Sequence, residues 1–269
     1  IEEGQRMIRF SIITIVRNDT VGVIRTLKSI FAQTYENFEI IVQDGASTDG
    51  TSEVLRSLGS LIDSLTIEPD DGIYDAMNRA LRRASGDYCI FMNAADFFID
   101  HTILEKVARL IDPEHDDIWA GQSTDDERGI VHKYRPPDQF WAGSTLDHQA
   151  AFIRTSLLKQ LEHDTRYKIC ADLQLFTRAR KRGARFKYND LVVARKPFAV
   201  GASSDFVDRL KDRLQMLEDA WGDTHPVKMQ ITKELRSNMA NTFDLNKDLI
   251  ATMSLEDLLV ARQKWISIL

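Results

Sequence analysis

Cysteine is scarce in this sequence of 269 residues, which contains only Cys89 and Cys170. The two have neither the spacing of a metal-binding motif nor the number needed for a disulfide framework, so they are typical of a reducing cytoplasm. Positively charged residues are outnumbered, since the sequence has 35 lysines and arginines against 41 aspartates and glutamates. Its formal net charge is -6. A nucleic-acid-binding protein needs a basic face for phosphates, so this balance argues against a nucleic-acid partner.

Long apolar runs are missing as well. No window approaches the roughly 18 consecutive apolar residues of a membrane-spanning helix, and the first residues lack the apolar core of a signal peptide. The composition is otherwise that of an ordinary globular protein, with 43% hydrophobic and 28% charged residues. We therefore expect a cytoplasmic protein that at most rests on the inner face of the cell membrane as a peripheral protein.

The first hundred residues alternate short apolar runs with amphipathic stretches. Residues 10–16 (FSIITIV) are apolar and β-branched and too short for a typical helix, so they predict a buried strand. Further strands are predicted at 39–43, 65–67 and 88–92, and helical spacing recurs between them, for example over 73–84. Strands that alternate with helices predict right-handed crossovers and an α/β fold with a mostly parallel, Rossmann-like sheet flanked by helices.

Polar side chains follow each predicted strand at its carboxyl end. Arg17 follows the first strand, Asp44 the second, Asp71 the third and the sequence NAAD, residues 93–96, the fourth. Ligands of open parallel sheets bind beyond the carboxyl ends of the strands. One cleft is therefore expected to collect all four groups.

The regular alternation fades after residue 99. Residues 101–200 mix single helices and strands, whereas the sequence beyond residue 201 has helical spacing over 206–221, 227–239 and 254–268. We therefore expect a main domain over residues 1–200 and a helical C-terminal extension over 201–269. The extension would serve dimerisation into a homo-oligomer, acceptor binding or contact with a membrane surface.

The segment 44–51 (DGASTDGT) resembles the nucleotide-binding loop of the family 2 inverting glycosyltransferases, which have the GT-A fold. The resemblance continues in the family's order over about residues 8–205 and is greatest for the bacterial enzymes of surface-polysaccharide assembly, of the colanic-acid type. Its further matches are 70–78, 86–88, 93–96, 148–149, 171–173 and 201–204. The resemblance implies that residues 8–100 of this chain form the half that binds the nucleotide-sugar, and that residues 101–200 form the half that binds the acceptor.

The resemblance implies transfer of a sugar from a nucleoside-diphosphate sugar to an acceptor hydroxyl with inversion. A UDP-sugar is the first choice of donor, with GDP- and dTDP-sugars as alternatives, and the acceptor would be a saccharide or a lipid-linked saccharide. A dinucleotide-dependent oxidoreductase is disfavoured because no Gly-x-Gly-x-x-Gly turn follows the first strand. A nucleotidyltransferase and a non-catalytic nucleotide-sugar-binding protein remain alternatives.

Donor contacts are expected from the first strand ends. By resemblance, Asp44 contacts the nucleotide, since a carboxylate at a strand end can accept hydrogen bonds from a base edge or a ribose. The alternative is a purely structural role for Asp44 in the turn. Arg17 stands where the family often has an aromatic residue that stacks on the base, and a guanidinium can also stack on a flat ring. The remaining donor-side residues are Asp71, Asp75, Asn78 and Asn93.

The sequence departs from the family at residues 93–96, where related enzymes usually carry an Asp-x-Asp-like motif that holds a divalent metal ion. Only Asp96 remains of that motif. Mn²⁺ and Mg²⁺ take a few carboxylates together with phosphate oxygens and water, so one protein carboxylate could suffice. Alternatively, Asp96 only caps the helix that begins near Asp100. On the acceptor side, His148 is a further candidate metal ligand, and with Gln149 it could instead contact phosphate or orient the acceptor.

Asp172 is the general base that the resemblance implies. It lies just ahead of a helical pattern over 173–182, so its alternative role is to cap that helix, and both roles can coexist. The reaction needs a carboxylate that removes the proton of the acceptor hydroxyl and a metal ion that stabilises the leaving nucleoside diphosphate as a Lewis acid. Asp172 and Asp96 would supply the two sides of this chemistry.

Overall fold

This computed structural model describes residues 7–125, 129–132 and 146–197, together with residues 212, 215, 216 and 219. The chain divides into two compact units, residues 1–166 with 171–200 and residues 167–170 with 201–269. The predicted motif at 201–204 and nearly all of the predicted helical extension lie outside the described residues. The extension and the domain boundary near residue 200 therefore stay predictions.

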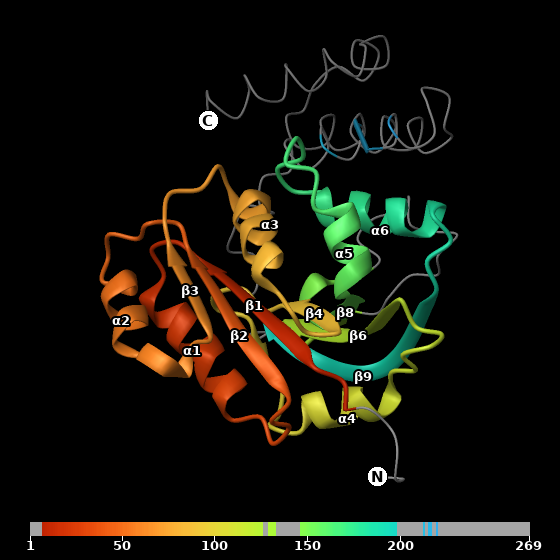
Figure 1. Cartoon of the computed structure of the whole chain (residues 1–269), viewed down its shortest axis with the longest axis horizontal. Coiled ribbons are helices and arrows are strands. Elements are labelled where there is room, and N and C mark those ends of the chain that lie inside the picture. Colours follow the sequence, from red (N-terminus) through yellow and green to blue (C-terminus); the bar gives the residue numbers. More distant parts are fainter. Residues whose placement is uncertain are drawn as a thin grey trace, which may run out of the picture. The chain divides into compact units, whose positions relative to one another are not determined.

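The first unit is built on one sheet flanked by helices (Figure 1). Its strand order is β3-β2-β1-β4-β8-β6-β9-β5, and β7 pairs with β6. The strands are β1 (Phe10–Val16), β2 (Phe38–Asp44), β3 (Ser64–Ile67), β4 (Tyr88–Phe91), β5 (Phe97–Phe98), β6 (Ile118–Asp125), β7 (Val131–His132), β8 (Ala151–Arg154) and β9 (Phe186–Lys196). The helices are α1 (Thr20–Phe31), α2 (Thr51–Ser57), α3 (Ile73–Arg83), α4 (Ile103–Leu110), α5 (Thr155–Leu161) and α6 (Ala171–Lys181), with short 3₁₀ turns at Gly59–Leu61 and His148–Ala150.

The predicted parallel α/β sheet is confirmed for its first half, since β3, β2, β1 and β4 are parallel neighbours. Beyond β4 the sheet is mixed, because β8 runs antiparallel to both β4 and β6. In register, Val16 faces Asp44, and Asp44 faces Ile67, so three strands end at one level. This alignment brings the polar loops that follow β1, β2 and β3 to the same edge of the sheet.

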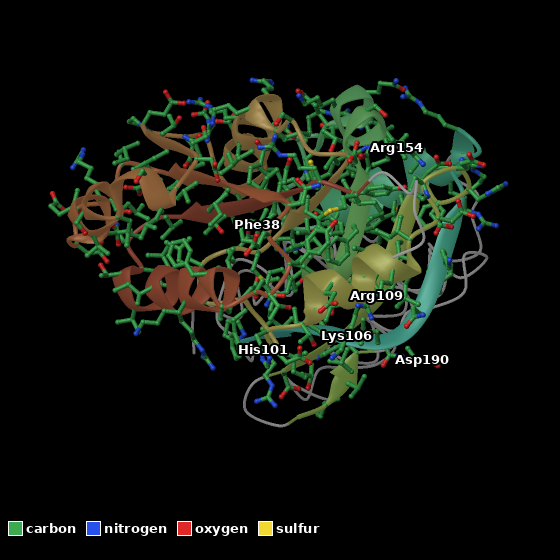
Figure 2. All side chains as sticks on the ribbon, turned by 60° about the horizontal axis from the view of Figure 1, so that its bottom comes forward. Phe38, His101, Lys106, Arg109, Arg154 and Asp190 are labelled. Carbon is green, nitrogen blue, oxygen red and sulfur yellow. The ribbon has the colours of Figure 1, made fainter. Side chains whose placement is uncertain are left out.

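Both faces of the sheet are covered by helices. Apolar residues of α1 and α4, such as Leu27 and Val107, share one buried cluster with Phe10 and Ile12 of β1. Helices α3 and α5 lie on the other face (Figure 1). Charged residues of α4 point away from the sheet (Figure 2), which is the division expected of an amphipathic helix. Among the described residues, no helix is long and apolar enough to cross a membrane.

Glu39 of β2 is a buried carboxylate that secures the turn from α3 into β4. It accepts hydrogen bonds from the Ser11 hydroxyl at 2.6 Å, the Ser85 amide at 2.6 Å, the Ser85 hydroxyl at 2.8 Å and the Gly86 amide at 3.0 Å. Burial by itself would raise the pKa of Glu39, but these four donors outweigh it and lower the pKa. The charged carboxylate is thus part of the folded structure.

We expect Glu39→Gln to lower the free energy of unfolding at pH 7 by about 2 kcal/mol, since hydrogen bonds to a charged group contribute about 1.5–3 kcal/mol. Because the folded-state pKa is depressed, this stability is present above the unfolded pKa of about 4.3 and is lost as pH falls through the folded value. Urea unfolding at pH 7 and at several lower values would test this. Glu36→Gln, at an exposed position, is the control, and an equal acid response in the parent and Glu39→Gln would contradict the assignment.

Candidate active site

The loops after β1 and β2 are hydrogen-bonded to each other at the carboxyl edge of the sheet. The backbone amide of Asn18 donates to Oγ of Ser47 at 2.7 Å, and its side-chain oxygen accepts from the amide of Thr48 at 2.8 Å. Asn18 adopts a left-handed backbone conformation, with φ of 52°, that allows both contacts. The segment that resembles a nucleotide-binding loop is therefore held in one shape by the neighbouring loop.

Asp44 shapes this loop from inside. It is fully buried and accepts hydrogen bonds from the Ser47 amide at 3.1 Å, the Ser47 hydroxyl at 2.5 Å and the Ser52 hydroxyl. Both carboxylate oxygens are thus engaged within the chain, although a carboxylate retains further lone pairs. Its contact with the nucleotide stays a prediction, and the loop-shaping role is the one that its hydrogen bonds display.

Arg17 offers the most available side chain in this region. It is exposed, and no hydrogen bond or ion pair holds it among the described residues. It lies close to Gly45, because a Cβ added to that glycine would be 3.2 Å from Cδ of Arg17 and 2.5 Å from Oδ2 of Asp70. The loops after β1, β2 and β3 therefore converge on Gly45, where a larger residue would require the Asp70 side chain to shift.

The three donor-side residues predicted around α3 differ in how far their side chains are already engaged in hydrogen bonds and ion pairs within the protein. Asp75 is bound by Arg79 at 2.8 Å and by the backbone amide of Asp71 at 3.1 Å. The side chain of Asn78 is buried and uses both its oxygen and its nitrogen on the backbone of His163. Only the Asp71 side chain is exposed and unpaired within the described part of the chain. Donor contacts stay predictions for all three, but Asp75 and Asn78 first serve the protein's own structure.

Asp96 is placed in the interior by a tight turn after β4. Its backbone amide donates to the carbonyl of Asn93 at 2.9 Å, and Ala95 takes a left-handed conformation with φ of 74°. Asp96 is 5% exposed, and burial raises its pKa. It caps no helix in the described part of the chain: α4 begins at Ile103, and within its first turn the amide of Leu104 donates to Oε1 of Gln33 at 3.1 Å. The capping alternative for Asp96 is therefore wrong.

Two residues of the turn before β8 contact Asp96. Nε2 of Gln149 donates to Oδ1 of Asp96 at 3.3 Å, and Nε2 of His148 lies 3.8 Å from Oδ2. Nε2 of His148 also lies 3.1 Å from Nδ2 of Asn93. Asn93, Asp96, His148 and Gln149, all predicted site residues, are thus brought together.

His148 also reaches the predicted base, since its Nδ1 lies 2.8 Å from Oδ2 of Asp172. Burial opposes the charged ring, but the carboxylates of Asp172 and Asp96 outweigh it and raise the pKa of His148 to about 10. His148 therefore bridges the two carboxylates on which the predicted chemistry rests.

Asp172 is the second residue of α6, so it belongs to the first turn and does not precede the helix as a cap. Its Oδ1 lies 3.0 Å from Nε2 of His163, a residue that no sequence motif marks. Burial alone would raise the pKa of Asp172, but His148 and His163 hold it well below its usual range. The carboxylate is thus kept charged between two imidazole rings.

The sequence matches the family model described as Glycosyl transferase family 2 over residues 11–185. This chain belongs to glycosyl transferase family 2. The match includes every predicted site residue from Arg17 to Asp172, and it confirms the resemblance that the motifs indicated. The chain is a glycosyltransferase.

Similar proteins share this assignment. The chain is 34% identical over 178 residues to the uncharacterized glycosyltransferase Rv1514c of Mycobacterium tuberculosis, covering 63% of this chain and 68% of the relative. It is 31% identical to the PGL/p-HBAD biosynthesis glycosyltransferase Rv2957 of the same species, over 74% of this chain and 81% of the relative. The glucosyltransferase WfgD of Escherichia coli, named for UDP-Glc and α-D-GlcNAc-diphosphoundecaprenol, is 29% identical over 42% of this chain and 46% of its own length.

Solved structures confirm the GT-A fold of the family. S. aureus TarS 1–349 in complex with UDP-GlcNAc superposes with a TM-score of 0.65 at 19% identity, over 93% of this chain and 77% of that chain. The chain spans 46% of the longer TarS structure. The mannosyltransferase PcManGT from Pyrobaculum calidifontis, in complex with GDP-Man and Mn²⁺, gives 0.62 at 22% identity, over 98% of this chain and 81% of that chain.

The residues around Asp96 fit a divalent ion as part of an open site. Oδ1 of Asn93 is buried and has no hydrogen-bond partner in the described part of the chain, which leaves a hard oxygen ligand available. Nδ1 of His148 is engaged by a carboxylate while Nε2 faces Asp96, an orientation common among metal-binding histidines. No group of three or more His, Cys, Asp or Glu side chains within the described residues could hold a metal ion by itself. Oxygens of a donor diphosphate would have to complete this glycosyltransferase site.

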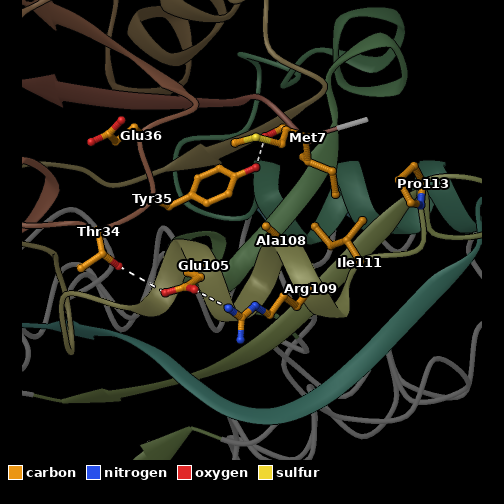
Figure 3. Close-up of a pocket in the computed structure, with 10 residues that line it drawn as sticks. Met7, Thr34, Tyr35, Glu36, Glu105, Ala108, Arg109, Ile111 and Pro113 are labelled. Atoms are coloured by element: carbon orange, nitrogen blue, oxygen red, sulfur yellow. Dashed lines mark hydrogen bonds and ion pairs between the residues drawn. The ribbon is translucent and has the colours of Figure 1, made fainter. Parts of the chain in front are cut away.

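A separate cavity of about 340 Å³ lies between α4 and the segment before β1 (Figure 3). Its lining includes Tyr35, whose hydroxyl donates to the carbonyl of Ile8 at 2.5 Å, and the ion-paired Glu105 and Arg109. It lies at the amino-terminal end of β1, whereas the predicted site residues follow the carboxyl ends of the strands. None of the predicted site residues lines it, so this cavity is separate from the predicted site.

Proposed function

We propose that this glycosyltransferase moves a sugar from a UDP-sugar to a hydroxyl group of a saccharide or lipid-linked saccharide, with inversion at the anomeric carbon. The observation that carries the proposal is the bridge formed by His148 between Asp96 and Asp172. It joins a carboxylate suited to the donor diphosphate to one suited to the acceptor, at the edge of the sheet where ligands of such folds bind. The name of WfgD supports UDP as the carrier and a lipid-linked saccharide as the acceptor, and the UDP-GlcNAc of the TarS complex also supports UDP. We place the reaction in the assembly of surface polysaccharide.

On the donor side, Asp96, with Asn93 and His148, would hold a divalent ion, Mn²⁺ or Mg²⁺. When bound, such an ion supplies Lewis-acid stabilisation of the departing diphosphate. His148 must release its Nε2 proton before that nitrogen can serve as a ligand, because only the neutral ring has a free lone pair there. The Mn²⁺ in the PcManGT complex supports a metal-dependent family member.

On the acceptor side, the carboxylate of Asp172 accepts the proton of the acceptor hydroxyl as general base. The hydroxyl oxygen then forms a bond to the anomeric carbon from the face opposite the diphosphate. The bond between that carbon and the diphosphate oxygen breaks, and the electron pair leaves with UDP. One such displacement inverts the anomeric configuration and needs no covalent sugar–enzyme intermediate.

A thermal-shift screen of UDP, GDP and dTDP with and without Mn²⁺ tests the donor assignment, since binding to the folded state raises its apparent stability. We expect the largest shift with UDP and Mn²⁺ together. Incubation with UDP-sugars and Mn²⁺, and separately with UTP, a sugar phosphate and Mn²⁺, then separates the alternatives. A transferase releases UDP slowly even without acceptor, a nucleotidyltransferase releases pyrophosphate from a nucleoside triphosphate and a sugar phosphate, and a non-catalytic binding protein leaves its ligand intact.

Arg17→Ala is expected to raise the dissociation constant for UDP by about 2-fold to 30-fold, because a cation on an aromatic face contributes about 0.5–2 kcal/mol. Arg17→Lys is the matched variant, since it keeps the charge but loses the planar group. In calorimetric titration, the dissociation constant for UDP of Arg17→Lys should therefore be close to that of Arg17→Ala. Equal binding by the Lys variant and the parent would show that charge, and not stacking, is what Arg17 provides.

The site in the cell and the assembly state stay proposals. We place the enzyme in the cytoplasm, with peripheral contact at the inner face of the membrane where a lipid-linked acceptor would be presented. Homo-oligomer formation through the extension at 201–269 is the accompanying proposal. Membrane fractionation and light scattering on the full chain would test the two independently.

A further inference from the structure

His163 lies against Asp172 from the interior of the protein. Its side chain is 2% exposed, and its Nε2 is 3.0 Å from Oδ1 of Asp172. A carboxylate in its charged form only accepts hydrogen bonds, so Nε2 must carry the proton. The other ring nitrogen, Nδ1, is buried and has no hydrogen-bond partner among the described residues. Nε2 is therefore the ring nitrogen of His163 that has a partner, and that partner is Asp172.

The ring of His163 is fixed on several sides. Its backbone amide donates to Oδ1 of Asn78 at 2.8 Å, and its carbonyl accepts from Nδ2 of the same residue at 2.8 Å. The ring stacks on Tyr74, with centroids 5.2 Å apart and planes at 23°, and meets Phe91 edge-on at 5.2 Å. Since backbone and ring are both held, the Nε2 donor has little freedom to turn away from the carboxylate.

The second partner of Asp172 is held less firmly. The His148 side chain is 20% exposed, ten times the fraction for His163, and its Nε2 faces Asn93 and Asp96 on the donor side. A ligand that binds Nε2 of His148 therefore acts on the same ring that donates to Oδ2 of Asp172. Oδ1 of Asp172 thus faces a deeply buried ring, whereas Oδ2 faces a ring that is partly exposed and also contacts the donor side.

We propose that His163 is a positioning residue that holds Oδ1 of Asp172 throughout turnover, so that Oδ2 is the oxygen that receives the proton of the acceptor hydroxyl. The proposal rests on the proposed role of Asp172 as base. The acceptor hydroxyl reaches Oδ2 in the place of Nδ1 of His148, while Oδ1 keeps its bond to Nε2 of His163. Without that bond the carboxylate can rotate, and the oxygen that takes the proton loses its alignment.

His163→Phe removes the donor but keeps a planar ring of similar size between Tyr74 and Phe91. We expect kcat to fall by about 10-fold to 100-fold, in line with the cost of misplacing a reacting group by about 1 Å, while KM for the donor stays within about twofold. His163→Gln carries an amide nitrogen that can reach the place of Nε2, and it should recover most of kcat. His115→Phe, an exposed histidine in the loop after α4, is the control for the ring substitution itself.

A double-mutant cycle separates positioning from a general structural effect. In a chain that already carries Asp172→Asn, adding His163→Phe should lower kcat by less than about twofold, because no base remains to be oriented. Thermal unfolding of each variant reports on folding. The proposal is overturned if a folded His163→Phe keeps kcat within about twofold of the parent, if His163→Gln fails to exceed His163→Phe, or if the two substitutions act additively.

An independent readout does not need activity. In protein labelled with ¹⁵N-histidine, the NMR signals of His163 should report a proton on Nε2, and they should shift when Asp172 is replaced by Asn. A His163 ring protonated on Nδ1 instead would refute the proposed contact even if the enzyme were inactive with every donor tried. Full transfer activity in Asp172→Asn, in contrast, would refute the base role of Asp172 and with it the proposed function of that residue.

Discussion

Replacement of Asp172 by Asn is expected to lower kcat for sugar transfer by about 10²-fold to 10⁴-fold, the usual contribution of a general base. The amide has nearly the size of the carboxylate but cannot take the proton. Because Asp172 would act on the acceptor, while it also holds the ring of the proposed metal ligand His148, the dissociation constant for UDP measured without a metal ion should change by less than about twofold. A loss confined to kcat is the signature of an interaction made mainly in the transition state.

The measurement combines initial rates at saturating donor with calorimetric titration of UDP. Thermal unfolding is needed beside it, because the amide nitrogen of the variant would face a histidine donor where the parent has an acceptor. Asp164→Asn is the matched control, since Asp164 lies in the loop before α6 and pairs with Arg166. Transfer activity equal to that of the parent in a folded Asp172→Asn would place the base elsewhere.

Asp96→Ala should abolish the dependence of nucleotide binding on the metal ion. In the parent, Mn²⁺ is expected to tighten UDP binding by more than about tenfold, since losing even a supporting partner of a metal ligand costs about 10-fold to 100-fold in affinity. In the variant, the dissociation constant for UDP should be the same with Mn²⁺, with Mg²⁺ and with EDTA. Removal of the only carboxylate in the turn at 93–96 leaves too few hard ligands for the ion.

Titration calorimetry of UDP in the three conditions measures this effect directly. Asp112→Ala is a suitable control, because Asp112 is a surface carboxylate in the loop after α4 that is bound to His115. The variant Asp96→Asn adds a second check, as it keeps the size and the contact with Gln149 but loses the charge. If Asp96→Ala binds UDP and Mn²⁺ as the parent does, the ion lies elsewhere or is not used.

Local patterns were sufficient to predict the elements that form the nucleotide half. The strand predicted at 10–16 is β1, and the run at 39–43 lies within β2. The helix predicted over 73–84 is α3, which ends one residue earlier than predicted. These elements are buried on a regular face or on both faces, so their apolar residues recur with the period of the structure. The polar residues that end the strands could be named for the same reason.

Elements whose burial is irregular could not be predicted in this way. Strand β9 (Phe186–Lys196) was missed because most of its residues are half-buried and its pairing with β6 shifts register twice. Neither an alternating pattern nor an apolar run results. Helix α5 (Thr155–Leu161) is only seven residues long and has too few turns to display a helical period.

The sequence by itself determined the family, the parallel half of the sheet and the carboxylates Asp96 and Asp172 as candidates for the chemistry. Tertiary structure decided what each polar group touches: Asp44 and Asn78 are turned inward to hold the chain, and His148 joins Asp96 to Asp172. It also brought in His163, which no motif marked. The physical reason is that strand and helix periods are local, whereas hydrogen bonds and the balance of burial and charge depend on segments that meet only when the sheet and its helices have assembled.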